Sequence, residues 1–159
     1  MKPFVQWKGH SLLALIARLY LAGIFLFACI HKIANPADFA MDIATYDILP
    51  LVFVNPMAIC LPWVELGAGI LLLAGYKSRG AAMAIGGMML MFLLAIIIAL
   101  VKGLDMSCGC FASQAMESDP IGAWTVVRDT SWLLLALYVI VFDRHPIGLD
   151  RWLEKRRQT

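Results

Sequence analysis

Two cysteines separated by one glycine, Cys108-Gly109-Cys110, are the residues of this sequence best suited to carry chemistry. A disulfide between residues two apart closes a very small ring, and Gly109 favours it because glycine adopts backbone angles that other residues avoid. Strained, exposed disulfides tend to be oxidising and labile rather than structural. The pair therefore predicts a dithiol that exchanges electrons with a partner. Two alternatives stay open: a Cu(I) or Zn(II) site, because soft thiolates bind both metals, and two inert cysteines.

The two other cysteines, Cys29 and Cys60, lie in apolar runs of the sequence. Both are expected in the same leaflet of a membrane as the Cys108/Cys110 pair. They could form a second dithiol that relays electrons between Cys110 and a quinone. The alternative is two separate buried cysteines, which are common small apolar residues.

Four charged residues interrupt the apolar runs: Arg18, Glu65, Arg128 and Asp129. Ionisable groups inside a membrane are costly, and they usually face the interior of a bundle and pair with one another. Glu65 and Arg128 fall about 13 Å and about 12 Å from the expected starts of their helices, at 1.5 Å per residue. We therefore predict a Glu65–Arg128 contact, joined from below by Arg18 and Asp129. This network either locks the bundle or forms a proton path or a polar anchor for a quinone head group.

The elements that must position these residues are membrane-spanning helices. The sequence is 62% hydrophobic and 15% charged, whereas an ordinary soluble domain has roughly 25% charged residues. A net charge of +2 is too small to indicate nucleic acid. We predict one domain, an all-α integral membrane bundle of four transmembrane helices, in contact with the lipid bilayer. The expected spans are about 11–30, 56–76, 80–101 and 120–142, with the Cys-Gly-Cys pair in the loop 102–119.

Asn-Pro and Asp-Pro pairs mark three expected helix starts, because Asn and Asp cap helices and proline suits the first helical position. Asn35-Pro36 opens a short amphipathic helix that reaches about Asp47 and lies in the interface. Asn55-Pro56 and Asp119-Pro120 open the second and fourth spans. Small residues between Ala82 and Gly87 predict a close approach of helix backbones in the third span. The basic C-terminal tail predicts an amphipathic helix on an anionic leaflet.

The distribution of lysine and arginine predicts the orientation, because these residues accumulate on the cytoplasmic side. The ends of the chain and the turn 77–79 carry most of them, whereas the other two loops hold Lys32 and Lys102. This bias predicts a bacterial inner-membrane protein with cytoplasmic termini and a periplasmic Cys108/Cys110 pair, where disulfides persist. The first span is longer than the apolar region of a signal peptide, so we expect no cleavage. His31 and Tyr46 are expected at the outer interface, as plain interfacial residues or proton carriers.

These residues together resemble the MauE/DoxX family of small membrane proteins, the MauE branch in particular. The similarity runs from about Arg18 to Trp132, and most of the chain is covered. The family pattern usually places Gly after the Phe of the cysteine loop, whereas this sequence has Ala112. The motifs that carry the resemblance are His31-Lys32, Phe39, Tyr46-x-x-Leu49-Pro50, Leu61-Pro62-Trp63-x-Glu65, Cys108-Gly109-Cys110-Phe111, Trp124 and Arg128-Asp129.

The resemblance implies a four-helix membrane protein engaged in periplasmic redox work. The MauE branch is associated with maturation of the disulfide-rich small subunit of methylamine dehydrogenase, beside a thioredoxin-like partner. DoxX relatives are tied to oxidation of sulfur compounds with quinone. The leading hypothesis is a thiol–disulfide redox protein that exchanges with a periplasmic thioredoxin-like protein or a client, with quinone as a candidate cofactor. The alternatives are a Cu(I)-handling membrane protein and a non-catalytic assembly subunit.

Overall fold

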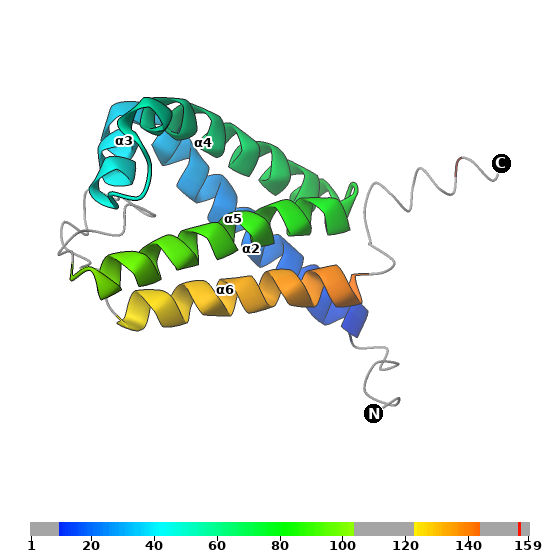
Figure 1. Cartoon of the computed structure of the whole chain (residues 1–159). Helices are drawn as coiled ribbons and strands as arrows, with labels where there is room; N and C mark the ends of the chain where they lie inside the picture. Colours follow the sequence, from blue (N-terminus) through cyan, green and yellow to red (C-terminus); the bar gives the residue numbers. More distant parts are fainter. Residues whose placement is uncertain (1–9, 104–122, 144–155, 157–159) are drawn as a thin grey trace.

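The structure, a computed structural model, describes residues 10–103, 123–143 and 156. The helices that it describes are α2 (His10–Ala34), α3 (Pro36–Thr45), α4 (Leu51–Ala74), α5 (Ser78–Val101) and α6 (Ala123–Phe142). Four of them, all except α3, are long and apolar enough to cross a membrane. The predicted all-α bundle of four spans is confirmed (Figure 1). The cysteine loop from residue 104 onward and the predicted C-terminal amphipathic helix lie outside the described residues, apart from Arg156.

Two helix boundaries differ from those predicted, and both differences lengthen a helix at the same end of the bundle. α2 continues past Ile30 to Ala34, where Pro36 opens α3 as expected. α4 begins at Leu51, directly after Pro50, so Pro56 lies inside the helix instead of opening it. A membrane helix tolerates an internal proline when neighbouring groups satisfy the freed backbone carbonyl. Helix α4 then ends at Ala74 and is capped by Gly75, whose left-handed φ of 66° favours glycine.

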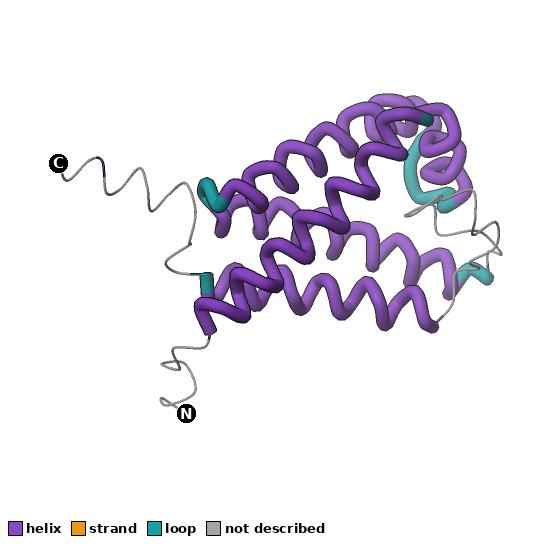
Figure 2. The backbone as a smooth tube through the Cα atoms, turned by 180° about the vertical axis from the view of Figure 1, so that it is seen from behind, coloured by secondary structure: helices purple, strands orange, loops and turns teal. Residues whose placement is uncertain are grey.

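The start of α2 and the end of α6 meet at one end of the bundle, here called the His10 end. The His10 ring stacks on Phe142 with centroids 4.3 Å apart, and its Nδ1 lies 2.7 Å from the Tyr138 hydroxyl. Arg79, at the start of α5, donates to the carbonyl of Ile140 at 3.0 Å. The spans therefore alternate in direction, and the end of α5 and the start of α6 lie at the opposite end together with α3 (Figures 1 and 2).

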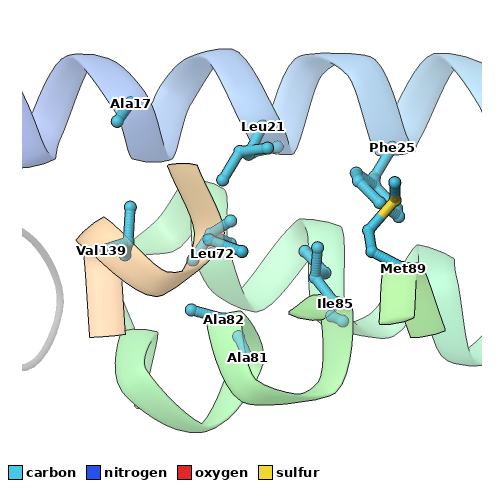
Figure 3. Close-up of a cluster of buried hydrophobic side chains, with 12 residues drawn as sticks. Ala17, Leu21, Phe25, Leu72, Ala81, Ala82, Ile85, Met89 and Val139 are labelled. Atoms are coloured by element: carbon cyan, nitrogen blue, oxygen red, sulfur yellow. The ribbon is translucent and has the colours of Figure 1, made fainter. Parts of the chain in front are cut away.

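Small residues let the helices pack closely around an apolar core (Figure 3). A Cβ atom on Gly86 of α5 would lie 3.7 Å from the Cβ of Ala136 on α6, so the predicted close approach in the third span is confirmed. A Cβ on Gly69 of α4 would lie 3.1 Å from the side chain of Leu26 on α2. The tight contacts hold α2, α4, α5 and α6 in one bundle. Its fully buried apolar residues include Leu21, Leu72, Ile85 and Val139.

Candidate functional site

Glu65 and Lys32 form a bidentate ion pair between α4 and α2. The Lys32 ammonium donates to Oε1 at 2.9 Å and to Oε2 at 3.0 Å. The side chains of Lys32 and Glu65 are only 11% and 7% exposed, respectively. The predicted Glu65–Arg128 contact is therefore wrong. The physical reason is the extra turn of α2, which carries Lys32 into the bundle at the depth of Glu65.

Arg128 instead lies beside its own neighbour on α6. Its Nε donates to Oδ1 of Asp129 at 3.2 Å, and its guanidinium lies 5.1 Å from the ring centroid of Trp132. Successive residues of a helix point about 100° apart, at 3.6 residues per turn, so only one of the two can face the interior. Asp129 is the one that does, being 1% exposed.

Arg18 lies far from this group, at the His10 end. Its Nη1 is 3.4 Å from Oδ2 of Asp143, and its side chain is 2% exposed. The prediction that Arg18 joins a Glu65–Arg128 contact is wrong, because Asp143 follows the last turn of α6 and reaches the cation there. The four buried charges that the sequence singled out thus belong to three separate pairs.

A small cavity of about 50 Å³ lies between the Lys32–Glu65 pair and Asp129. Its polar groups are the Lys32, Glu65 and Asp129 side chains, contributed by α2, α4 and α6. Asp129 Oδ2 is buried and has no hydrogen-bond partner among the described residues. A buried polar atom without a partner is costly and calls for an explanation, such as a bound group. Four aromatic side chains complete the wall: Phe25, Phe39, Phe92 and Trp132.

A second cavity, of about 350 Å³, adjoins the first. Helices α4 and α5 meet at the turn after Gly75 and diverge toward the other end, where α3 lies (Figure 1). The wall of the large cavity is almost entirely apolar and comes from α3, α4, α5 and the segment 46–49 that precedes α4. The two cavities share the side chains of Phe39, Leu61, Met91 and Phe92.

The polar residues of the large cavity are Asp42 of α3 and Tyr46, the C-terminal cap of α3. Burial, assisted by the negative charges of Asp42 and Asp129, raises the pKa of Tyr46 well above its ordinary value. The phenol therefore stays protonated and can donate a hydrogen bond. The Tyr46 ring packs edge-on against Phe92, with centroids 6.0 Å apart. Tyr46 is buried among the helices, whereas its expected position at the outer membrane interface stays a prediction.

The structure does not bring Cys29 and Cys60 together. Both are free, and Cys29 is buried whereas Cys60 is exposed. The Lys32–Glu65 pair fixes the register of the antiparallel helices α2 and α4. In that register Cys29 and Cys60 are about eight residues, or roughly 12 Å, apart along the helix axis. A disulfide needs Cα atoms within about 7 Å, so this arrangement does not support a disulfide. Cys108 and Cys110 lie outside the described residues.

Sequence reasoning missed the roles of Lys32, Tyr46 and Trp132, although the signal for Lys32 was present. Phe25 and Cys29, buried on α2, are followed at helical spacing by Lys32, which places all three on one face. On α6, the buried residues Thr125, Asp129, Ala136 and Val139 form a stripe that includes Asp129 and leaves out Arg128. Tyr46 lacks such a signal because its burial depends on contacts with distant helices.

The comparisons with known proteins agree on one family. The model of the family described as methylamine utilisation protein MauE matches residues 10–142. The protein named methylamine utilization protein MauE of Methylophilus methylotrophus is 32% identical over 138 residues, 86% of this chain and 72% of the relative. Its namesake in Paracoccus denitrificans is 26% identical over 87% of this chain and 70% of the relative.

A further namesake, from Methylorubrum extorquens, is 27% identical over 76% of this chain and 64% of the relative. No solved structure matches the chain. The matched residues run from the first described helix to the last turn of α6 and include every residue of the two cavities. The chain belongs to the MauE family of membrane proteins.

Proposed function

We propose that this protein is a membrane thiol–disulfide redox protein in which Cys108 and Cys110 are the exchanging pair. The observation that carries the proposal is the position of Cys108-Gly109-Cys110 in the sequence that joins α5 to α6. Residues 103 and 123, which flank that segment, lie at the α3 end of the bundle, opposite the His10 end. The lysines and arginines of the 77–79 turn and the chain ends favour the α3 end as the periplasmic one.

The names of the relatives supply the biological setting of the proposal. They are called methylamine utilization proteins, and we infer that this chain serves the same metabolism. Its partner would be a periplasmic thioredoxin-like protein or a disulfide-containing client. A pair of cysteines in a chain that forms an apolar bundle fits a membrane-bound exchange partner better than a soluble oxidoreductase.

The proposed exchange moves two electrons. A thiolate of one partner attacks a disulfide sulfur of the other, and a mixed disulfide forms while one thiolate leaves. The second thiol of the attacking pair then resolves the mixed disulfide, so one partner ends as a disulfide and the other as a dithiol. If Cys108 and Cys110 start as the dithiol, they reduce the client. The disulfide so formed returns to the dithiol by taking two electrons and two protons from a hydroquinone. In the opposite direction, a pair that starts as the disulfide oxidises the client, and a quinone then reoxidises the dithiol by accepting two electrons and two protons.

Trapping the mixed disulfide tests this proposal. Cys108→Ser and Cys110→Ser are expressed singly in a host grown on methylamine, and free thiols are blocked at harvest before non-reducing separation. Without the resolving cysteine, the mixed disulfide is not resolved and persists. One of the two variants should therefore carry a covalent adduct that a reductant releases. The double variant is the control and should carry none. If neither single variant forms an adduct, the proposed exchange is wrong.

A further inference from the structure

The two adjoining cavities form a site with one polar end and one apolar end. At the polar end, Asp129 is 1% exposed and its Oδ2 has no partner among the described residues. Its other oxygen, Oδ1, accepts from Arg128 Nε at 3.2 Å. The Arg128 guanidinium favours the ionised form of Asp129, and in that form the side chain accepts hydrogen bonds and has no proton to donate. The open oxygen therefore calls for a donor that comes from outside the described residues.

The walls of the small cavity indicate what kind of group carries that donor. Four aromatic rings surround the space beside Asp129, and aromatic side chains pack favourably against another ring in offset or edge-to-face geometry. The small cavity holds about 50 Å³, which accommodates water as well as a hydroxyl group at the edge of a ring. A hydroxyl on an aromatic ring would satisfy Oδ2 and use the aromatic wall.

The large cavity indicates the chemical character of the rest of the ligand. Its volume of about 350 Å³ is within the range of small-molecule sites, roughly 300–1,000 Å³. Its lining includes Ile48, Leu94 and Ile98, which are 42%, 52% and 41% exposed. Leu94 and Ile98 lie on the transmembrane helix α5, so their exposed surface faces the hydrocarbon of a bilayer. An apolar molecule could therefore enter from the membrane.

We propose that the joined cavities bind a lipid-soluble phenol, a hydroxylated aromatic ring on a hydrocarbon tail, whose hydroxyl donates to Asp129 Oδ2. The ring lies against Phe92 and Trp132, and the tail leaves through the large cavity between α3 and α5. A hydroquinone and a redox-inert phenolic lipid share this chemistry. A bound hydroquinone would deepen the proposed redox function, whereas binding itself needs neither Cys108 nor Cys110.

Binding to the full chain in phosphatidylcholine nanodiscs tests the site. The probes are 4-dodecylphenol, decyl-hydroquinone, the corresponding decyl-quinone and 1-dodecanol, and the signal is quenching of tryptophan fluorescence, checked by native mass spectrometry. Saturable binding of dodecylphenol, with dodecanol at least about tenfold weaker, is expected. Because an ionised acceptor prefers a donor, the hydroquinone should bind about tenfold or more tightly than the quinone. Equal binding of dodecanol and dodecylphenol, or of hydroquinone and quinone, would overturn the proposal.

Asp129→Asn gives a sharper test, because it reverses the direction of the hydrogen bond while keeping the shape of the side chain. Its oxygen is expected to stay with Arg128, so its amide N–H₂ faces the cavity and donates. The preference should reverse: hydroquinone and dodecylphenol should weaken about tenfold or more, and the quinone should bind as well or better. Asp38→Asn, the same change on the exposed face of α3, is the matched control and should leave all affinities unchanged. Identical phenol binding by Asp129→Asn and wild type would contradict the assignment.

The comparison of probes separates the sources of the ligand. If dodecylphenol binds and the hydroquinone does not, the natural ligand is a redox-inert phenol; if both bind, it includes a hydroquinone. Two further variants keep the test decisive if Asp129→Asn fails to fold. Ala95→Leu narrows the large cavity without touching a polar group, so it should weaken long-tailed probes more than unsubstituted phenol. Cys108→Ser/Cys110→Ser should bind all probes as the wild type does. Failure of the thiol-exchange proposal would therefore leave this result unaffected.

Discussion

The Lys32 ammonium lies 2.9 Å and 3.0 Å from the two oxygens of Glu65, and this pair ties α2 to α4 at the wall of the small cavity. The same ammonium lies 5.0 Å from the ring centroid of Phe39 on α3. One cation therefore fixes three helices at the end of the bundle where α3 lies. Because Phe39 lines both cavities, the pair also shapes the proposed ligand site.

Removal of one partner of this pair should destabilise the bundle strongly. Glu65→Gln or Lys32→Met leaves an uncompensated buried charge, and such a change typically costs about 3–5 kcal/mol. The double variant Lys32→Met/Glu65→Met should recover much of the loss, because it removes both charges. Thermal unfolding in one detergent measures the three variants. Lys102→Met is the control, since Lys102 is 41% exposed and its partner Asp47 is 87% exposed; exposed pairs contribute about 0–1 kcal/mol. A single variant as stable as this control would contradict the account.

Gly86 and Gly87 should respond differently to the same substitution. A side chain on Gly86 meets Ala136 of α6, whereas a Cβ on Gly87 meets no atom of the described residues within 4 Å. Gly86→Leu forces the two helices apart, and overpacking of this kind costs about 1–3 kcal/mol. Gly87→Leu should have little effect, since it points away from the bundle. The midpoint of thermal unfolding for both variants is the measurement, and equal loss in both would show that α5 and α6 do not pack as described.

Asp42 should make the folded state less stable at neutral pH than at acidic pH. Burial raises the pKa of this carboxyl above its ordinary 3.8, and the charge of Asp38 adds to the rise, against the opposing effect of His31 and Lys32. Between pH 3.8 and the raised pKa, the folded state binds more protons than the unfolded state, so stability falls as pH rises.

Asp42→Asn removes that cost and should raise the unfolding temperature at about pH 7. The gain should shrink as the pH falls and vanish below the ordinary pKa, where wild-type Asp42 is protonated in both states. The Thr45 hydroxyl donates to the backbone carbonyl of residue 42, so the substitution leaves that bond in place. A gain of the same size at every pH would mean that ionisation of Asp42 is not its cause.

Labelling of single cysteines should establish the orientation of the spans. In a background without native cysteines, Lys102→Cys lies at the α3 end and Arg79→Cys lies at the His10 end. A maleimide that does not cross membranes should label Lys102→Cys in intact spheroplasts, and should label Arg79→Cys only after permeabilisation. The reverse pattern would place the α3 end, and the cysteine loop next to it, in the cytoplasm.

Hydropathy and helix signals predict the architecture of this protein well, because span length and apolar composition follow directly from the thickness of a bilayer. The Asn35-Pro36 start of α3 is likewise local, and it is observed. Local signals fail at Asn55-Pro56, where a helix already begun at Leu51 continues through the proline. Val54 is the buried residue of that early turn, whereas Leu51, Val52 and Phe53 are exposed. A local motif does not report the burial of Val54.

The partner of each buried charge depends more on which face of its helix carries the residue than on how far the residue lies along the helix. Depth alone matched Glu65 to Arg128, whereas the face of α6 selects Asp129 and the lengthened α2 supplies Lys32. The cavities are less predictable still, since they arise where α4 and α5 diverge and α3 fills the space incompletely. Such a space depends on the angles between helices, for which the sequence has no local signal.

The most direct measurement counts the reactive thiols of Cys108 and Cys110 in native membranes. A maleimide mass tag that reaches only the outer face is applied to wild type and to Cys108→Ser/Cys110→Ser, before and after mild reduction. The account predicts two tags on wild type after reduction and none before, with both lost in the double variant. Such a result identifies a labile disulfide on the periplasmic side. Cysteines that are tagged without reductant, or only from the cytoplasmic face, would contradict the redox account.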